Sequence, residues 1–183
     1  MLLIALGLIL WTWPHLMKSV TPSLQARLGD RVARPLAALF ALAAIVLMVI
    51  GYRSAAGAQL YTPPVWGVHA NSLLNLIAVA LMGAGSSKSH LRNLTRHPMN
   101  LGLLIWCLAH LLVRGSEEAV LLWGGLAVWS LLAIALTDRA ARAKPAFAGA
   151  SLAGDLRLTL IALALYGVIV WLHILLGLQP FGG

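Results

Sequence analysis

Six runs of mainly apolar residues alternate with short polar stretches along the chain. Each run is close to the roughly 20 residues that an α-helix needs to cross the hydrocarbon of a bilayer. Only helices and closed barrels satisfy all their backbone polar groups inside lipid, so each run is predicted to be a transmembrane helix. Pro35 and Pro98 are predicted to lie in the first turn of a helix, where proline is tolerated. The predicted spans cover residues 2–17, 35–51, 68–85, 98–113, 119–137 and 158–178.

Composition agrees with a membrane protein. Of the 183 residues, 61% are apolar and 10% are charged, whereas soluble domains are roughly half apolar and about a quarter charged. The first run has no basic residue before it and no A-x-A-like cleavage site soon after it, so it is predicted to be a retained span. We expect a single domain over residues 1–183, an all-α, polytopic membrane bundle of about six transmembrane helices.

The net charge of +8 is distributed unevenly among the five predicted loops. In chain order the loops hold 4, 1, 3, 1 and 4 lysine and arginine residues, which accounts for all 13. Cytoplasmic loops carry the excess of basic residues, so the odd-numbered loops are predicted to be cytoplasmic and both termini to lie outside. Basic loops at the membrane surface indicate anionic lipid as the partner and argue against nucleic acid.

Histidine is the ionisable residue that stands out near the predicted spans. Ionisable side chains inside a membrane are costly and therefore mark candidate functional sites. The chain has six histidines, whereas its five acidic residues all lie in or next to loops, which leaves no pair of carboxylates for acid–base chemistry. The predicted topology separates an inner set of histidines (His15, His90, His97) from an outer set (His69, His110, His173).

These positions suggest a haem site, because histidine is a common axial ligand of haem and bundle cofactors are held by side chains on facing helices. Two axial ligands approach one iron from opposite faces, so they should come from different helices at one depth. His15 with His97 meets this condition, and so does His110 with His173. His97 and His110 are 13 residues apart, about 20 Å along a helix, and cannot bind the same iron. The alternative for each histidine is an ordinary residue at a helix end.

Two tryptophans and the cysteine lie close in the sequence to candidate histidines. Trp11 precedes His15 by four residues and Trp106 precedes His110 by four, so either pair could form the wall of a cofactor pocket. Cys107 is the only cysteine, which excludes an intrachain disulfide. It is either a small buried apolar side chain or a thiolate near a cofactor.

Asn71 and Asn75 also share one face of the third predicted span. Hydrogen bonding between helices is the role that such amides usually have in membranes. The wall of a pocket is the second possibility for this pair.

The central part of the chain resembles a known family. An R-H-P-x-x-x-G pattern begins at Arg96 and is followed by W-x-x-A-H-L from Trp106. This combination is similar to the NnrU family of bacterial membrane proteins. Further similarities bring the resemblance to nearly the whole chain: His15 followed by Lys18-Ser19, and a closing Trp171-Leu172-His173 with Gly177 and Pro180.

The resemblance implies a haem b protein of the bacterial inner membrane. The family is associated by name with nitrite and nitric oxide reductase metabolism, and it is related to 15-cis-zeta-carotene isomerase, an integral membrane enzyme that uses haem b. The isomerase's histidine ligands correspond to His15 and His110, a pair that the predicted topology places at different depths. The candidate iron ligands are therefore His110, His15, His173 and His97, and the candidate cofactor contacts are Arg96, His97, Asn100, Trp106 and Cys107.

Several functions stay open at this point. If the chain is an enzyme, the resemblance implies a haem-dependent cis-trans isomerase of polyene double bonds, acting on an apolar small molecule. A non-catalytic haem or redox protein in denitrification is the alternative, and a structural membrane factor is the third. The oligomeric state is also open.

The R-H-P-x-x-x-G pattern also resembles the isoprenylcysteine carboxyl methyltransferases, which use S-adenosylmethionine. Asn100 stands where that family has a tyrosine, and Asp138-Arg139 stands where it has paired glutamates. These departures argue against methyl transfer.

Overall fold

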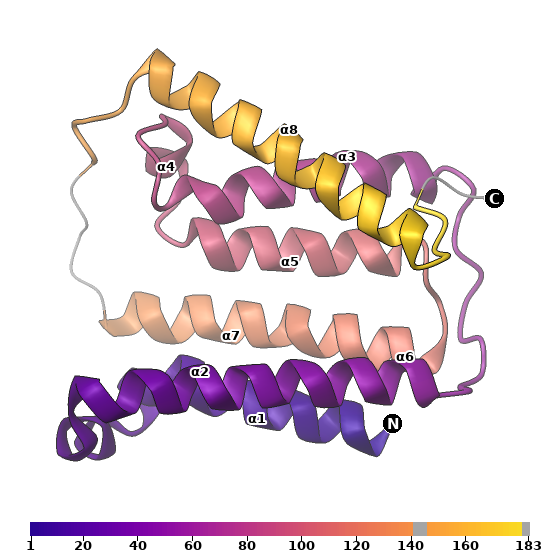
Figure 1. The fold of residues 1–183 in the computed structure, drawn as a ribbon, viewed down its shortest axis with the longest axis horizontal. Helices are drawn as coiled ribbons and strands as arrows, with labels where there is room; N and C mark the ends of the chain where they lie inside the picture. Colours follow the sequence, from indigo (N-terminus) through magenta and orange to yellow (C-terminus); the bar gives the residue numbers. More distant parts are fainter. Residues whose placement is uncertain (141–145, 181–183) are drawn as a thin grey trace. The chain divides into compact units, whose positions relative to one another are not determined.

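The structure is a computed structural model that describes residues 1–140 and 146–180; for residues 17–20, 22, 24–25 and 138–140 it describes the backbone alone. Throughout the described residues the regular elements are helices, which confirms the all-α prediction (Figure 1). They are α1 (Leu2–Val20), α2 (Pro22–Ser54), α3 (Gly67–Ala84), α4 (Leu91–Leu94), α5 (Pro98–Leu111), α6 (Glu117–Ala119), the π-helical turn η1 (Val120–Gly124), α7 (Gly125–Ala140) and α8 (Leu152–Leu175).

The six predicted spans each correspond to an apolar helical segment. Among the described residues, four helical segments are long and apolar enough to cross a membrane, namely Ala26–Ser54, Gly67–Ala84, Glu117–Thr137 and Leu152–Leu175. The other two predicted spans are the shorter apolar helices Leu2–Leu16 and Pro98–Leu111. At 14 residues, α5 is about 21 Å long. The chain is therefore a polytopic helical membrane protein.

The amino-terminal part of α2 differs from the prediction, because it is helical where a loop was expected. Helix α2 begins at Pro22 and is interrupted only at Gly29, whose φ of 67° and ψ of 159° suit glycine alone. The helix resumes at Asp30, whose carboxylate accepts a hydrogen bond from Arg34 at 2.8 Å, a favourable i,i+4 pair. Pro35 consequently lies inside α2, so its predicted place in a first turn was wrong, whereas that of Pro98 is confirmed.

Helix α8 also begins earlier than the predicted span. Ser151 is its N-cap, and the Ser151 hydroxyl accepts a hydrogen bond from the backbone N–H of Gly154 at 3.1 Å. Asp155 and Arg157, which were assigned to a loop, lie in the first turns of the helix. A carboxylate in a first turn is favoured by the helix dipole, so Asp155 suits the start of α8.

The chain divides into two compact units. Unit 1 consists of Met1–Tyr61 and Gly115–Ala140 and contains α1, α2, α6, η1 and α7. Helix α1 packs along α2 and also contacts η1 and α7. At Gly7 a Cβ atom would lie 2.9 Å from the Ala44 carbonyl oxygen, so glycine is what allows α1 to approach α2 this closely.

Unit 2 consists of Thr62–Arg114 and Ala141–Gly183, and α3 lies at its centre, packed against both α5 and α8. At Gly102 of α5 a Cβ atom would lie 2.8 Å from the Ala78 carbonyl oxygen of α3. At Gly154 of α8 a Cβ atom would collide with the Lys88 carbonyl group. Glycine therefore allows a close approach of the backbone in both units. The prediction of one domain over 1–183 stays a prediction.

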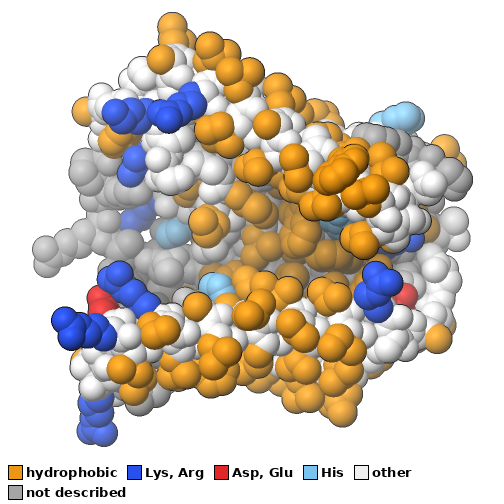
Figure 2. Space-filling model, in the orientation of Figure 1, with side chains coloured by type: hydrophobic (Ala, Val, Ile, Leu, Met, Phe, Trp, Pro, Cys, Tyr) orange, Lys and Arg blue, Asp and Glu red, His pale blue; other side chains and the backbone are white. Residues whose placement is uncertain are grey.

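Apolar side chains cover much of the visible outer surface of the helices (Figure 2). On α8 the exposed side chains include Leu156, Leu160 and Trp171. Within its most apolar 18-residue stretch only 11% of the residues are buried. Soluble proteins do not expose such continuous apolar surfaces, so this is the surface of a membrane-embedded protein.

Candidate functional site

Three of the predicted iron ligands make the same hydrogen bond to their own helix. The Nδ1 atoms of His15, His110 and His173 lie 2.7, 2.8 and 2.7 Å from the carbonyl oxygen four residues earlier. A carbonyl oxygen only accepts hydrogen bonds, so each Nδ1 must carry the ring proton. The lone pair of each neutral imidazole is then on Nε2, the arrangement found in metal-binding histidines whose other nitrogen donates to the protein.

His15 lies in an aromatic cluster within unit 1. Its ring stacks on Trp11 with centroids 3.9 Å apart and an interplanar angle of 28°. The Trp129 ring of α7 is nearly perpendicular to both rings, and its centroid lies 5.4 Å from that of His15 and 5.8 Å from that of Trp11. The indole nitrogens of Trp11 and Trp129 are buried and have no hydrogen-bond partner within the part of the chain that the structure describes. The cluster therefore combines an imidazole with two donors that a ligand could satisfy.

His110 lies in the last turn of α5, in unit 2. The Trp106 ring meets it edge to face, with centroids 4.9 Å apart and planes at 71°. Its flanking residue Ala109 is fully buried, and so is Cys107, which fits the prediction of a small buried side chain. Helix α5 packs on α3, and both of these small residues of α5 are fully buried.

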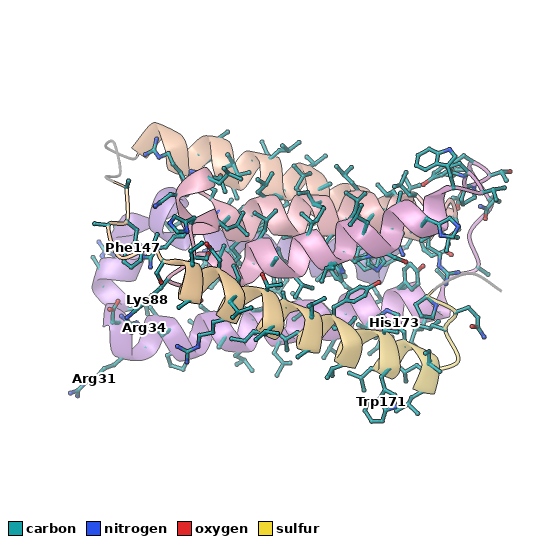
Figure 3. All side chains as sticks on the ribbon, turned by 90° about the horizontal axis from the view of Figure 1, so that it is seen from above. Arg31, Arg34, Lys88, Phe147, Trp171 and His173 are labelled. Carbon is teal, nitrogen blue, oxygen red and sulfur yellow. The ribbon has the colours of Figure 1, made fainter. Side chains whose placement is uncertain are left out.

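His173 lies in the last turn of α8, at the end of that helix opposite to Lys88 and Phe147 (Figure 3). Its side chain is half-buried. His110 and His173 come from different helices of one unit, as the predicted depth-matched pair requires. His15 belongs to unit 1 and His97 to unit 2, so the predicted pairs that include His15 stay predictions.

The Arg96–Asn100 segment lies at the opposite end of α5 from His110. His97 is the N-cap residue of α5, and its carbonyl accepts the backbone N–H of Leu101 at 2.9 Å. Its own backbone N–H donates to the Thr95 hydroxyl at 3.3 Å. His97 and His110 thus lie at opposite ends of a 14-residue helix, as expected for residues that do not share one iron.

The remaining two histidines have different surroundings. His69 is exposed in the first turn of α3. Nδ1 of His90 lies 2.6 Å from Oδ2 of Asp155, and the His90 backbone N–H donates to Oδ1 of the same carboxylate at 2.7 Å. This double contact ties the start of α4 to the first turn of α8. No local sequence pattern connects residues 90 and 155, so sequence reasoning missed it.

Asn71 and Asn75 bond to each other within α3. The Asn75 amide donates to the Asn71 side-chain oxygen at 2.7 Å and to its carbonyl oxygen at 2.9 Å. The expected bond between helices is thus replaced, for this amide, by one along a single helix. The Asn75 side-chain oxygen is buried and has no hydrogen-bond partner among the described residues.

Protein side chains alone do not build a metal centre in the described ranges. No group of three or more histidine, cysteine, aspartate or glutamate residues is found there that could hold a metal ion. A haem needs only one or two axial ligands, because the porphyrin supplies the rest. The side chains of Lys18, Ser19, Asp138 and Arg139, which entered the two resemblances, lie outside the described residues.

Comparison with known proteins gives one match. A family model described as "NnrU protein" matches residues 3–180, which is almost the full length of the chain. No curated protein and no solved structure matches the chain. The match includes every histidine discussed above and both compact units.

Proposed function

Since the chain belongs to the NnrU family, we propose that it is a membrane protein that binds haem b through histidine. The family links the chain to the expression of nitrite and nitric oxide reductases. We also propose that the chain is related to 15-cis-zeta-carotene isomerase and that it lies in a bacterial inner membrane. The single observation that carries it is the shared Nδ1–H hydrogen bond, which leaves the lone pair on Nε2 in His15, His110 and His173.

His110 and His173 are the residues that we assign first as ligands. They lie on α5 and α8 of one unit, and the hydrogen bonds to Trp106 and Ile169 fix the tautomer of each ring. A backbone acceptor on Nδ1 also raises the basicity of Nε2, as in known metal sites. Trp106 adds an apolar surface beside His110. Arg96, whose guanidinium would suit a propionate, lies at the opposite end of α5 and is not assigned to this haem. When bound, haem would supply an iron that can act as a Lewis acid or change oxidation state.

Isomerisation of a polyene is the reaction that suits this chain best if it is an enzyme. A double bond can isomerise without any net proton transfer, so the reaction needs no acid–base pair. The carboxylates of Glu117, Glu118 and Asp155 lie in the first turns of their helices, away from the middle of the spans. An apolar substrate would reach the protein through the lipid. A non-catalytic haem protein that supports nitrite metabolism is the alternative.

Methyl transfer is supported less well. It requires a pocket for S-adenosylmethionine near Arg96, and the cavity that Arg96 lines has a volume of about 180 Å³. Sites for ligands of drug size are typically about 300–1,000 Å³. This cavity is therefore small for a nucleoside with an amino acid attached.

The test of the haem proposal is an absorption spectrum of the protein purified in mild detergent after expression with ample haem. We expect a sharp Soret band in the oxidised protein and resolved bands after reduction with dithionite. His110→Ala and His173→Ala should alter or abolish these bands, and His69→Ala, at an exposed position on α3, is the matched control. A spectrum without haem bands would reject the proposal, and so would equal effects of all three variants.

A further inference from the structure

A short turn directly before α3 exposes two large apolar side chains. We call residues 64–67 the α3 turn. At its tip Val65 is 94% exposed and Trp66 is 61% exposed. No lysine, arginine, aspartate or glutamate lies between Arg53 and Lys88, so the tip has no charged residue near it in the sequence. Adjoining apolar side chains that are this exposed indicate a surface that contacts something other than water.

The α3 turn is held in one conformation by its own residues and by α5. Pro63 and Pro64 each have a fixed φ. The Pro64 carbonyl oxygen accepts a hydrogen bond from the Gly67 backbone N–H at 2.8 Å, which closes the turn. A Cβ atom at Gly67 would collide with the Leu112 carbonyl oxygen, so the turn also lies close against the end of α5. The tip is therefore preorganised and loses little conformational entropy when it contacts a partner.

The tip continues an exposed apolar stripe of α3. The Trp66 backbone is already helical, with a φ of −67° and a ψ of −16°, and its carbonyl oxygen accepts the Ala70 N–H at 3.2 Å. Leu73 follows Trp66 by seven residues and Ile77 follows Leu73 by four, so these three share one helix face and all are exposed. Ala78, on the face that packs on α5, is fully buried. The tip is thus continuous with the surface of α3 that faces lipid.

The length of α3 places the tip at the edge of the hydrocarbon. Helix α3 has 18 residues and is about 27 Å long, whereas the hydrocarbon of a typical bilayer is about 30 Å thick. The helix is followed by Ser86, Ser87 and Lys88, which are suited to the headgroups. From those headgroups an untilted α3 reaches almost across the hydrocarbon, and a tilted α3 falls further short. The tip therefore lies where acyl chains meet headgroups and not in the water beyond them.

We propose that Val65 and Trp66 insert into the membrane interface, where the acyl chains of phospholipids meet their headgroups. The charge distribution predicts that this leaflet is the outer one. Tryptophan is enriched at that level because its ring is apolar and its N–H can donate to lipid oxygens. Through the contact of Gly67 with Leu112, the turn also anchors the end of α5 that carries His110. The inference is independent of haem.

Spin labels at single cysteines test this contact in the full chain. Cys107 is the only cysteine and is fully buried, so Cys107→Ala gives a background without a native thiol. In this background Val65→Cys is labelled with a nitroxide and reconstituted into phosphatidylcholine vesicles. Oxygen concentrates among the acyl chains and a nickel chelate stays in water, so the ratio of their collisions with the nitroxide reports its depth. We expect the label to lie within about 5–10 Å of the boundary between headgroups and acyl chains.

Two further positions bracket this depth. Leu73→Cys lies on the same stripe, about 10 Å deeper along the helix than Trp66, and should give a higher ratio of oxygen to nickel collisions. Ala58→Cys is the matched control, because Ala58 is exposed in the same loop but its carbonyl oxygen accepts the backbone N–H of the acidic residue Glu117 at 3.0 Å. Its label should lie in water. We expect the ratio to rise several-fold from position 58 to 65 and again from 65 to 73.

The three labels distinguish the possible surroundings of the tip. A ratio at position 65 between those at 58 and 73 would support insertion into the interface. Equal ratios at 58 and 65 would place the tip in water and overturn the proposal. A label at 65 that neither oxygen nor nickel reaches would show that protein, such as a second copy of this chain, covers the tip, and would overturn it as well. A helical circular dichroism spectrum for each labelled variant shows that folded proteins are compared.

Discussion

The turns that carry His15 and His110 are built from one local pattern but lie in different surroundings. In both, a tryptophan precedes the histidine by four residues, and its carbonyl oxygen accepts the Nδ1 proton at 2.7 or 2.8 Å. His15 is exposed and stacks on its tryptophan at 28°, whereas His110 is half-buried and meets its tryptophan at 71°. Local sequence thus accounts for the tautomer, and the packing of neighbouring helices accounts for the orientation of the rings.

The neighbours of each turn explain this difference. In unit 1 the Trp129 ring fits against both Trp11 and His15, so aromatic side chains dominate that turn. In unit 2 two small residues close to His110 in the sequence, Cys107 and Ala109, are fully buried. A side chain that is already partly buried loses less conformational entropy on binding a ligand, and His110 is half-buried whereas His15 is exposed. We therefore expect His110 to be the stronger ligand of the two.

Removing each imidazole tests that ranking and has the largest expected effect. His110→Ala should lower the bound haem by at least about tenfold, because an iron ligand contributes at least as much as its supporting residues. His15→Ala should leave most of the haem bound. Haem content is measured from the ratio of Soret to protein absorbance. An equal loss in both variants would assign His15 a ligand role as well and would contradict the ranking.

Larger side chains at the glycines where α5 meets α3 and α1 meets α2 should have the second-largest effect. In Gly102→Leu the new Cβ would lie 2.8 Å from the Ala78 carbonyl oxygen, and the rest of the side chain would need further space. In Gly7→Leu of unit 1 the new Cβ would lie 2.9 Å from the Ala44 carbonyl oxygen. Each should cost about 1–3 kcal/mol, as overpacking usually does. Gly102→Leu should also lower haem binding, and Gly7→Leu should not. Thermal unfolding followed by circular dichroism gives the stability.

Gly167→Leu is the control for both glycine variants, because nothing lies within 4 Å of a Cβ at that position of α8. It should unfold at the wild-type temperature or slightly above it, since leucine is the better helix former. Destabilisation equal to that of Gly102→Leu would show that the effect comes from lost glycine and not from helix contact.

Trp11→Phe should have a smaller effect. The buried indole nitrogen of Trp11 has no hydrogen-bond partner among the described residues, so its removal leaves no new unsatisfied group. We expect a change in unfolding free energy of about 1 kcal/mol or less. A larger loss, seen only in the presence of a ligand, would show that this N–H serves the ligand. Thermal melts with and without added haem distinguish the two results.

His90→Ala should have the smallest effect. The contact between His90 and Asp155 is short, but both side chains are substantially exposed to solvent, where ion pairs contribute little. We expect the melting temperature to fall by no more than about 2 °C. The spectrum of bound haem should not change, because this pair lies at the end of α8 opposite to His173. A large spectral change would link α4 to the haem site.

Hydrophobic patterning was sufficient to predict the helices, because a membrane-spanning helix requires about twenty consecutive, mainly apolar residues. The pairing of Trp11 with His15 and the helix start at Pro98 also follow from local spacing, and the structure confirms them. The break at Gly29 was not recognised, since the flanking charges suggested a loop, whereas Asp30 and Arg34 stabilise a helical turn.

Contacts between distant residues account for what the sequence did not show. Trp129 joins the His15 cluster, and Phe147 packs against Arg92, only because residues far apart in the sequence meet in space. The i,i+4 rule predicts neighbours along one helix and has no counterpart for such pairs. The R-H-P-x-x-x-G pattern identifies Arg96 as a candidate residue, but the sequence does not predict the cavity that Arg96 lines.

The shortness of α5 has a consequence for the surrounding lipid. A helix of 14 residues spans about 21 Å, whereas the hydrocarbon of a typical bilayer is about 30 Å thick. Hydrophobic mismatch of this size is relieved when the bilayer thins around the protein or when flanking basic side chains reach outward to the headgroups. The protein should therefore be more stable in vesicles of short-chain phospholipids, and in a cell membrane it should gather the shorter acyl chains around α5.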